Sequence, residues 1–190
     1  MTGDKPSHNI DERIGESGSA GRLEIDTPVV ADGPELYRIT RDSAVLDVNS
    51  SYAYLLWCRD FAQTSAVARI DGAVVGFVTG YIRPDAPDTL VVWQIAVDAS
   101  QRGGGVASRL LGHLVDRVQP RGIRYLETTI TPDNAASIKL FTALARSRSA
   151  ELQRSELFTA DLFPDAHLGE DLYRIGPFAA APAVAAANGR

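Results

Sequence analysis

The residues best suited to binding a ligand form a glycine-rich run, Arg102-Gly103-Gly104-Gly105-Val106-Ala107, directly before an amphipathic segment. Glycines let the backbone approach a ligand closely, and the first turn of a helix presents unpaired N–H groups at the positive end of the helix dipole. Such a turn can cradle a pyrophosphate. A glycine-rich turn between a strand and a helix can also be only a tight connection. The surrounding elements must therefore show whether it binds a ligand.

Two nucleotide-binding loops do not fit the spacing. A Walker loop requires the pattern GxxxxGK[ST], and the chain contains no Gly-Lys pair. A dinucleotide fingerprint GxGxxG could begin at Gly103 and Gly105, with Glu127 at a plausible distance, but its third position is Ser108. Five residues also separate Gly103 from Val97, where the preceding strand is expected to end. Neither loop is therefore predicted.

The segments around the run are predicted to alternate strands with helices. Residues 89–97 are almost wholly apolar, as in a central strand buried on both faces, and residues 104–118 place apolar side chains at a helical period. Asp71-Gly72 is a favourable two-residue hairpin turn. The predicted elements are, in chain order, a helix over 34–43, a helix from Ser50 or Ser51, strands 65–70 and 74–81, a loop 83–88, strand 89–97, helix 104–118, strand 124–130, helix 134–145, and weaker strands near 150–154 and 171–175.

This order, ααβββαβαββ, predicts an α/β (α+β) fold with a mixed, mostly antiparallel sheet and strand 89–97 in its middle. A helix between two adjacent strands implies one parallel crossover. We expect the folded domain to span residues 23–178. Residues 1–22 are rich in Gly, Ser, Asp and Glu, and residues 179–190 form a low-complexity Ala/Pro segment, so both ends are expected to lack fixed structure.

Composition narrows the class of protein. The chain has 190 residues, 45% of them apolar and 23% charged, and no run approaches the roughly 18 apolar residues that a membrane span needs. The first twenty residues lack the apolar core of a secretory signal, so a soluble cytoplasmic protein is expected. The net charge is −5 and no basic block is present, which argues against nucleic acid as a partner.

Cysteine and histidine usage gives no sign of a disulfide or a metal site. The single cysteine, Cys58, cannot form an internal disulfide and is interpreted as a packing residue. The three histidines, His8, His113 and His167, are scattered without zinc-ligand spacing. We therefore expect no metal.

The glycine-rich run resembles the acyl-CoA signature of the GCN5-related N-acetyltransferases (GNAT). Arg102 to Ala107 match every fixed position of that signature, [QR]-x-x-G-x-[GA], and Asn134, in Thr131-Pro132-Asp133-Asn134-Ala135-Ala136-Ser137, matches the Asn that opens the family's next helix. The resemblance covers about residues 23–176. It implies the GNAT fold, a mixed, mostly antiparallel sheet with a splayed parallel strand pair and flanking helices, and it implies acetyl-CoA as the acetyl donor.

The resemblance also implies where acetyl-CoA binds. In this family the pantetheine inserts as a pseudo-strand beside the central strand, here at Ile95, Ala96 and Val97, and a backbone N–H near Ile95 stabilises the oxyanion. No side-chain nucleophile is required. The implied cofactor contacts are Ile95, Ala96, Val97, Arg102, Gly103, Gly104, Gly105, Val106, Ala107 and Asn134.

Three flanking segments resemble a narrower group, the L-2,4-diaminobutyrate acetyltransferases of ectoine biosynthesis. They are 47–54, 92–97 and 161–164, the last followed by His167 and Glu170. The resemblance implies N-γ-acetylation of a small diamino acid, with acceptor contacts from Asp47, Tyr52, Trp93, His167 and Glu170. Two alternative functions remain: acetylation of another small amine or a protein N-terminus, and a noncatalytic acyl-CoA-binding module. A homodimer is also possible.

The amine poses a chemical requirement. An ammonium with a pKa of about 10 is neutral in only about one molecule in a thousand at pH 7, a deficit of roughly 4 kcal/mol. Asp47, Glu170 and Asp171 are the candidate carboxylates, and Asp171 is interpreted as a surface acid. We expect Glu170 to assist deprotonation and His167 to take part in catalysis.

One position departs from the family pattern. Many of these enzymes carry a tyrosine seven residues after the helix-opening Asn, where it protonates the leaving thiolate, and this chain has Phe141 there. Water, another side chain such as Tyr54, or unassisted release of the thiolate must replace it.

Overall fold

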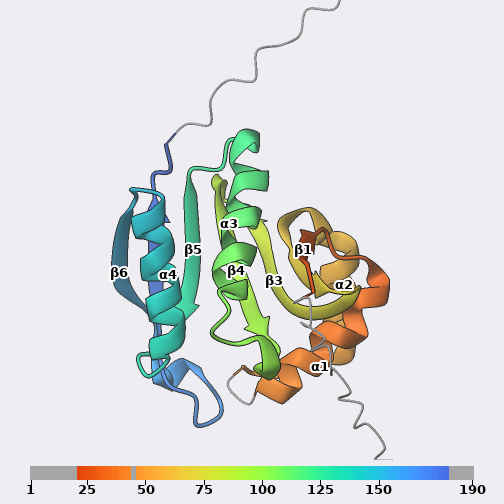
Figure 1. The fold of residues 1–190 in the computed structure, drawn as a ribbon. Coiled ribbons are helices and arrows are strands. Elements are labelled where there is room, and N and C mark those ends of the chain that lie inside the picture. Colours follow the sequence, from red (N-terminus) through yellow and green to blue (C-terminus); the bar gives the residue numbers. More distant parts are fainter. Residues whose placement is uncertain (1–20, 44–45, 180–190) are drawn as a thin grey trace, which may run out of the picture.

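The described residues of the computed structural model, 21–43 and 46–179, form a seven-stranded mixed sheet with helices on both faces (Figure 1). The predicted ends 1–22 and 179–190 lie almost entirely outside this range. The strands are β1 (Leu23–Asp26), β2 (Ala66–Ile70), β3 (Ala73–Arg83), β4 (Ala86–Val97), β5 (Tyr125–Ile130), β6 (Glu151–Phe158) and β7 (Glu170–Gly176). The helices are α1 (Gly33–Ser43), α2 (Ser51–Asp60), α3 (Val106–Val118) and α4 (Ala135–Ser147), with short 3-10 turns η1 (Val30–Asp32), η2 (Ala62–Thr64), η3 (Ala99–Gln101), η4 (Gln119–Arg121) and η5 (Ala160–Leu162).

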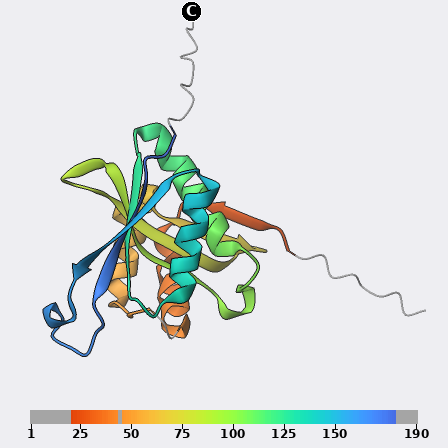
Figure 2. The same cartoon turned by 90° about the vertical axis from the view of Figure 1, so that its left-hand side faces the viewer.

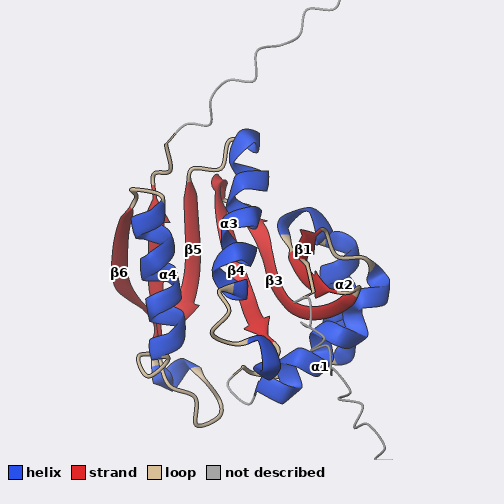
Figure 3. Ribbon diagram, in the orientation of Figure 1, coloured by secondary structure: helices blue, strands red, loops and turns tan. Residues whose placement is uncertain are grey.

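The strand order is β1-β2-β3-β4-β5-β7-β6, so β4 occupies the middle as predicted (Figure 3). β4 and β5 are parallel and the other neighbours are antiparallel. The predicted fold class is confirmed. No helix in the described part of the chain has the length and apolarity to cross a membrane.

Two predictions about the elements are wrong. The short edge strand β1 was not expected, although it pairs with β2 along its whole length. The loop expected over 83–88 is only the two-residue turn Pro84-Asp85, because β3 continues to Arg83 and β4 already begins at Ala86. The last hairpin is also longer than expected, since β6 runs to Phe158.

Two hydrophobic clusters hold the helices against opposite faces of the sheet. On β3 the adjacent residues Val78 and Phe77 belong to different clusters. Val78 packs with apolar residues of α3 and α4, which lie side by side on one face (Figure 2). Phe77 packs with Leu36 of α1 and Tyr54 of α2 on the other face.

β4 and β5 separate after three residue pairs. Their parallel register runs only from Thr89 opposite Tyr125 to Val91 opposite Glu127. Within the described residues no pairing between these strands continues beyond that point, whereas β4 remains paired with β3 as far as Val97. One edge of the last part of β4 is therefore open toward β5.

A bulge lies in β4 just after this separation. Thr79 of β3 is opposite Gln94, whereas the next residue, Gly80, is opposite Val92, so Trp93 is the extra residue. An extra residue reverses the faces to which the following side chains point.

The change of face is visible in the packing. Ahead of the bulge Val92 packs with α3, and beyond it Ala96 packs in the cluster of α1 and α2. Gln94, two residues before Ala96, therefore points toward α2.

Candidate active site

The open edge of β4 presents backbone groups toward β5. The Asp98 N–H donates to the Val75 carbonyl on β3 at 2.8 Å. Because successive residues of a strand direct their N–H and C=O groups to opposite sides, Ala96 also faces β3, and Ile95 and Val97 face the gap. The predicted contribution of Ile95 and Val97 is compatible with this geometry, whereas the polar backbone of Ala96 is directed away.

The glycine-rich loop beside this gap adopts a conformation that favours glycine. Gly103 and Gly105 have φ values of 79° and 75°, and a Cβ built on either residue would meet no atom within 4 Å. Gly105 is the N-cap of α3, and the helix's first backbone bond runs from Arg109 N–H to the Gly105 carbonyl at 3.1 Å. The N–H groups of the first turn have no partner within the helix, and the space over Gly103 and Gly105 is open, which together suit a phosphate group.

Other predicted cofactor residues have structural roles. Val106 is buried, so it can offer only its backbone. Arg102 is exposed, and its Nε lies 3.3 Å from the Val97 carbonyl. Asn134 caps α4, with its Oδ1 accepting from the Ser137 N–H at 3.0 Å, so a cofactor contact falls to its amide nitrogen. Gly104 and Ala107 lie in the same loop and first turn.

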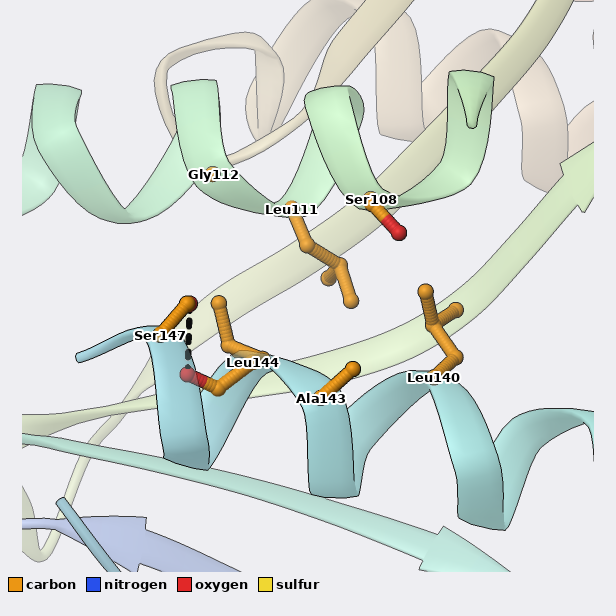
Figure 4. A pocket seen from close by; sticks show the side chains of 7 residues that line it. All are labelled: Ser108, Leu111, Gly112, Leu140, Ala143, Leu144 and Ser147. Atoms are coloured by element: carbon orange, nitrogen blue, oxygen red, sulfur yellow. Dashed lines mark hydrogen bonds between the residues drawn. The ribbon is translucent and has the colours of Figure 1, made fainter. Parts of the chain in front are cut away.

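A groove of about 200 Å³ lies between α3 and α4 (Figure 4). The Ser108 hydroxyl of α3 points into it, opposite Leu140 of α4. The Ser147 hydroxyl donates to the Leu144 carbonyl at 2.8 Å. The groove is mostly apolar and begins one turn from the glycine-rich loop, and none of the predicted acceptor residues lines it.

Two carboxylates and an imidazole meet near the end of β4. Asp47 comes from the segment before α2, His167 comes from the loop after η5, and Glu170 is the first residue of β7. His167 Nε2 lies 3.2 Å from Asp47 Oδ2 and 3.7 Å from Glu170 Oε1. The side chains are 84% (Asp47), 23% (Glu170) and 18% (His167) exposed. The structure thus brings these three predicted residues together.

The surroundings of His167 favour its protonated form. Its pKa is raised above the ordinary value of 6.5, first by the hydrogen bond from Nδ1 to the Leu168 carbonyl and then by Asp47 and Glu170. Because the Leu168 carbonyl can only accept, Nδ1 carries a hydrogen, and the second proton binds at Nε2 between the two carboxylates. The ring also stacks on Phe163, with 4.2 Å between centroids. The site is therefore anionic at high pH and partly neutralised at low pH.

Known proteins of one family are similar to most of this chain. Residues 33–145 match the model of the acetyltransferase (GNAT) family. The chain belongs to the GNAT family. Over 161 residues it is 62% identical to the L-2,4-diaminobutyric acid acetyltransferase of Streptomyces coelicolor, covering 83% of this chain and 95% of that protein. It is 48% identical to the enzyme of the same name from Marinococcus halophilus, covering 86% and 95%.

A solved structure adds the fold and the ligands of a relative. Diaminobutyrate acetyltransferase EctA from Paenibacillus lautus, in complex with L-2,4-diaminobutyric acid and coenzyme A, aligns with a TM-score of 0.81 at 35% identity. The alignment covers 85% of this chain and 99% of that one. The resemblance inferred from the sequence is confirmed for the family and for this group of its members.

Two predicted acceptor aromatics of this GNAT enzyme stand apart from the carboxylate cluster. Tyr52, on the first turn of α2, and Trp93, at the bulge, are both largely exposed. Trp93 stacks on Trp57 of α2, with 6.1 Å between centroids. Among the described contacts no hydrogen bond or ring contact joins either residue to His167, so their predicted contact with the acceptor stays a prediction.

Three residues considered from the sequence have structural roles. Asp171 forms an ion pair with Arg154 and its side chain is only 16% exposed, so it is less solvated than the surface acid that was expected. Tyr54 is fully buried and its hydroxyl donates to Gln94 Oε1 at 3.3 Å, so it is not available to protonate a thiolate. Phe141 is buried in the core beneath α4. Among the described residues no group of three side chains could hold a metal ion.

Gln94 and Trp57 were not predicted from the sequence. The only signal for Gln94 was a lone amide in an apolar strand, which does not reveal the direction of the side chain. Trp57 was hidden among the apolar residues of α2.

Proposed function

We propose that this chain transfers the acetyl group of acetyl-CoA to the γ-amino group of L-2,4-diaminobutyrate, giving N-γ-acetyl-L-2,4-diaminobutyrate for ectoine biosynthesis. The observation that carries this proposal is the cluster of Asp47, His167 and Glu170 at the open end of β4 in a GNAT fold. A substrate with two ammonium groups requires opposing carboxylates. The names and identities of the bacterial relatives support the same substrate.

In the proposed reaction the neutral amine attacks the thioester carbonyl directly. Glu170 accepts a proton from the substrate ammonium, directly or through water, and Asp47 fixes the substrate's other charged end. The Ile95 N–H, which faces the gap between β4 and β5, stabilises the negative charge that develops on the carbonyl oxygen. The carbon–nitrogen bond forms as the carbon–sulfur bond breaks, and CoA leaves as its thiolate. The nitrogen, positively charged after the attack, gives its second proton to solvent to become the neutral amide.

The departing thiolate takes its proton without a dedicated tyrosine. Phe141 occupies the usual position, and the Tyr54 hydroxyl is bound to Gln94. A thiolate is a tolerable leaving group. Because the pKa of an ordinary alkyl thiol lies above neutral pH, solvent can protonate it after departure.

The residues around the gap fit acetyl-CoA. The open space over Gly103 and Gly105 and the uncapped start of α3 suit the pyrophosphate, and the free edge of β4 suits the pantetheine amides. The proposed donor contacts are therefore the backbones of Ile95 and Val97 and of residues 103–107, with Arg102 and Asn134 at the rim.

We further propose that the enzyme is cytoplasmic and that its acetyltransferase domain spans residues 23–178. In this proposal it forms a homodimer and binds neither nucleic acid nor a membrane. Acetyl-CoA is available in the cytoplasm, and the net charge of −5 opposes binding to a phosphate backbone. Leu157 and Phe158 on β6 and Leu168 in the loop before β7 are exposed apolar side chains that contact with a second copy would bury. Sedimentation of the full chain measures its mass directly, and a monomer at micromolar concentration would exclude the dimer.

The test is a screen of amines with acetyl-CoA, following release of free thiol and then the mass and regiochemistry of the product. Diaminobutyrate should give the γ-acetylated product with a higher kcat/KM than ornithine, lysine or a peptide N-terminus. Preference for another amine would replace the substrate assignment. CoA binding without thiol release from any amine would instead favour a binding module.

A further inference from the structure

The bulge in β4 delivers one polar side chain to the acceptor side of the sheet. With a regular strand Gln94 would continue the row of Leu90 and Val92 into the apolar core beneath α3. The extra residue Trp93 turns it to the face of α2 instead. There Gln94 is only 8% exposed, so its amide must find partners within the protein.

Both ends of this amide are hydrogen-bonded. Nε2 donates to the Asp47 carbonyl at 2.9 Å, and Oε1 accepts from the Tyr54 hydroxyl at 3.3 Å. Because a backbone carbonyl can only accept, the amide nitrogen must face Asp47, which fixes the orientation of the group. Tyr54 is fully buried in α2. A chain of hydrogen bonds therefore runs from α2 through β4 to the segment that carries Asp47.

Asp47 needs such an anchor. Its side chain is largely exposed, and His167 Nε2 is its partner among the described side chains. An exposed acid on a connecting segment has little packing to hold it in place. The bond from Gln94 fixes the backbone of Asp47 to the residue that directly precedes Ile95, whose N–H faces the donor gap.

We propose that Gln94 is a positioning residue, which holds the Asp47 carboxylate at a fixed place relative to the thioester-presenting edge of β4. The proposal rests on the proposed function. Gln94 does not touch the substrate in this scheme, and it acts through the backbone of Asp47.

The first test compares a variant that removes both hydrogen bonds of the Gln94 amide with one that removes only the bond to Tyr54. Gln94→Met keeps the length of the side chain and loses the bonds to Asp47 and Tyr54, and it should raise KM for diaminobutyrate about tenfold while the Kd for CoA stays unchanged. Tyr54→Phe is the matched control, because it removes only the bond to Tyr54 and leaves the anchor to Asp47, and its KM should stay close to wild type. Gln94→Glu, which keeps an acceptor for Tyr54 and lacks the donor, replaces Gln94→Met if that variant does not fold.

A second readout does not depend on turnover. Asp47 raises the pKa of His167, so release of the Asp47 segment should lower the pKa of His167 measured by NMR titration. Gln94→Met and Asp47→Asn should lower it in the same direction, and Tyr54→Phe should not. The Leu168 carbonyl and Glu170 still favour the imidazolium, so part of the shift should remain.

A double-mutant comparison completes the test. In an Asp47→Ala background, Gln94→Met should cause no further loss in kcat/KM for diaminobutyrate. Additive losses, a parallel loss of CoA affinity, or an unchanged KM together with an unchanged His167 pKa would each overturn the proposal. Absence of turnover in the wild-type protein would instead count against the proposed function, and the NMR titration would still decide the role of Gln94.

Discussion

His167 and Asp47 lie 120 residues apart in the chain, yet His167 Nε2 is 3.2 Å from Asp47 Oδ2. In the proposed scheme the imidazolium and the substrate's ammonium compete for this carboxylate. Because the pKa of His167 is raised above 6.5, protonated His167 persists at higher pH than an ordinary histidine.

We predict that kcat/KM for diaminobutyrate falls as the pH is lowered through this raised pKa. Protonation of Nε2 neutralises Asp47 and repels the incoming ammonium. A pH profile of kcat/KM measures the effect, and His167→Gln should remove this titration from the profile. An identical profile in both proteins would show that another group controls binding.

Stability should respond to pH in the opposite direction. A histidine whose pKa is raised on folding stabilises the folded state fully below its unfolded pKa, and this contribution disappears as the pH rises through the folded value. The difference in melting temperature between wild type and His167→Gln should therefore be largest below pH 6.5 and shrink as the pH rises through the raised pKa of His167.

The glycine-rich loop gives a prediction with an internal control. Gly105 and Gly72 have φ values of 75° and 82°, and a Cβ on either would meet no atom within 4 Å. Alanine at either position should cost a similar amount of stability, about 1 kcal/mol, because both are forced into the left-handed region. Only Gly105→Ala should also weaken CoA, since its methyl group enters the space assigned to the pyrophosphate.

Calorimetric titration with CoA measures this difference. Gly72→Ala should bind CoA like wild type, although its melting temperature falls by a similar amount. If both variants bind CoA equally well, the pyrophosphate lies elsewhere.

Local patterns in the sequence predicted most of the elements that position the site. The glycines of the loop and the Asp71-Gly72 turn act through their own backbone preferences, so short-range chemistry was enough to find them. β1 was missed because four residues at a sheet edge carry little pattern. The prediction of a loop over 83–88 was wrong because a proline does not end a strand at every position. Pro87 lies in β4 ahead of Thr89, where the pairing with β5 begins, so its missing N–H costs no hydrogen bond to β5.

The cluster of Asp47, His167 and Glu170 was predicted from the family resemblance and not from any local pattern in the sequence. Nothing local indicates that a carboxylate before α2 meets a histidine in the loop before β7, since the contact depends on tertiary structure. Gln94 was missed for a related reason: a bulge changes the face of every later side chain in the strand, and alternation along the sequence does not reveal it.

Substitutions of the two acids at the start of β7, Glu170 and Asp171, should distinguish a catalytic role from a structural one. Glu170→Gln should lower kcat by about a hundredfold or more, with the Kd for CoA unchanged, because the amide cannot accept the proton from the substrate ammonium. Asp171→Asn is the matched control, since it changes the adjacent residue and disrupts only the ion pair with Arg154. Steady-state kinetics of the two variants decide the assignment, and near-normal turnover in Glu170→Gln would make Asp47 the leading candidate for the base.

The last prediction concerns the point at which β4 and β5 separate. Glu127, opposite Val91 in the final parallel pair, is only 4% exposed and accepts from Arg83 on β3 at 2.9 Å and from Arg174 on β7 at 2.7 Å. Glu127→Ala removes the buried carboxylate that two partly exposed arginines share, so it should lower the free energy of unfolding by about 2 kcal/mol, and Glu127→Gln should cost less because its amide oxygen still accepts from one guanidinium. Asp85→Ala is the matched control, because Asp85 binds the same Arg83 at an exposed turn, and its unfolding midpoint should stay near that of wild type. Urea unfolding of the three variants measures the differences, and equal midpoints for Glu127→Ala and Asp85→Ala would mean that Glu127 does not hold the three strands together.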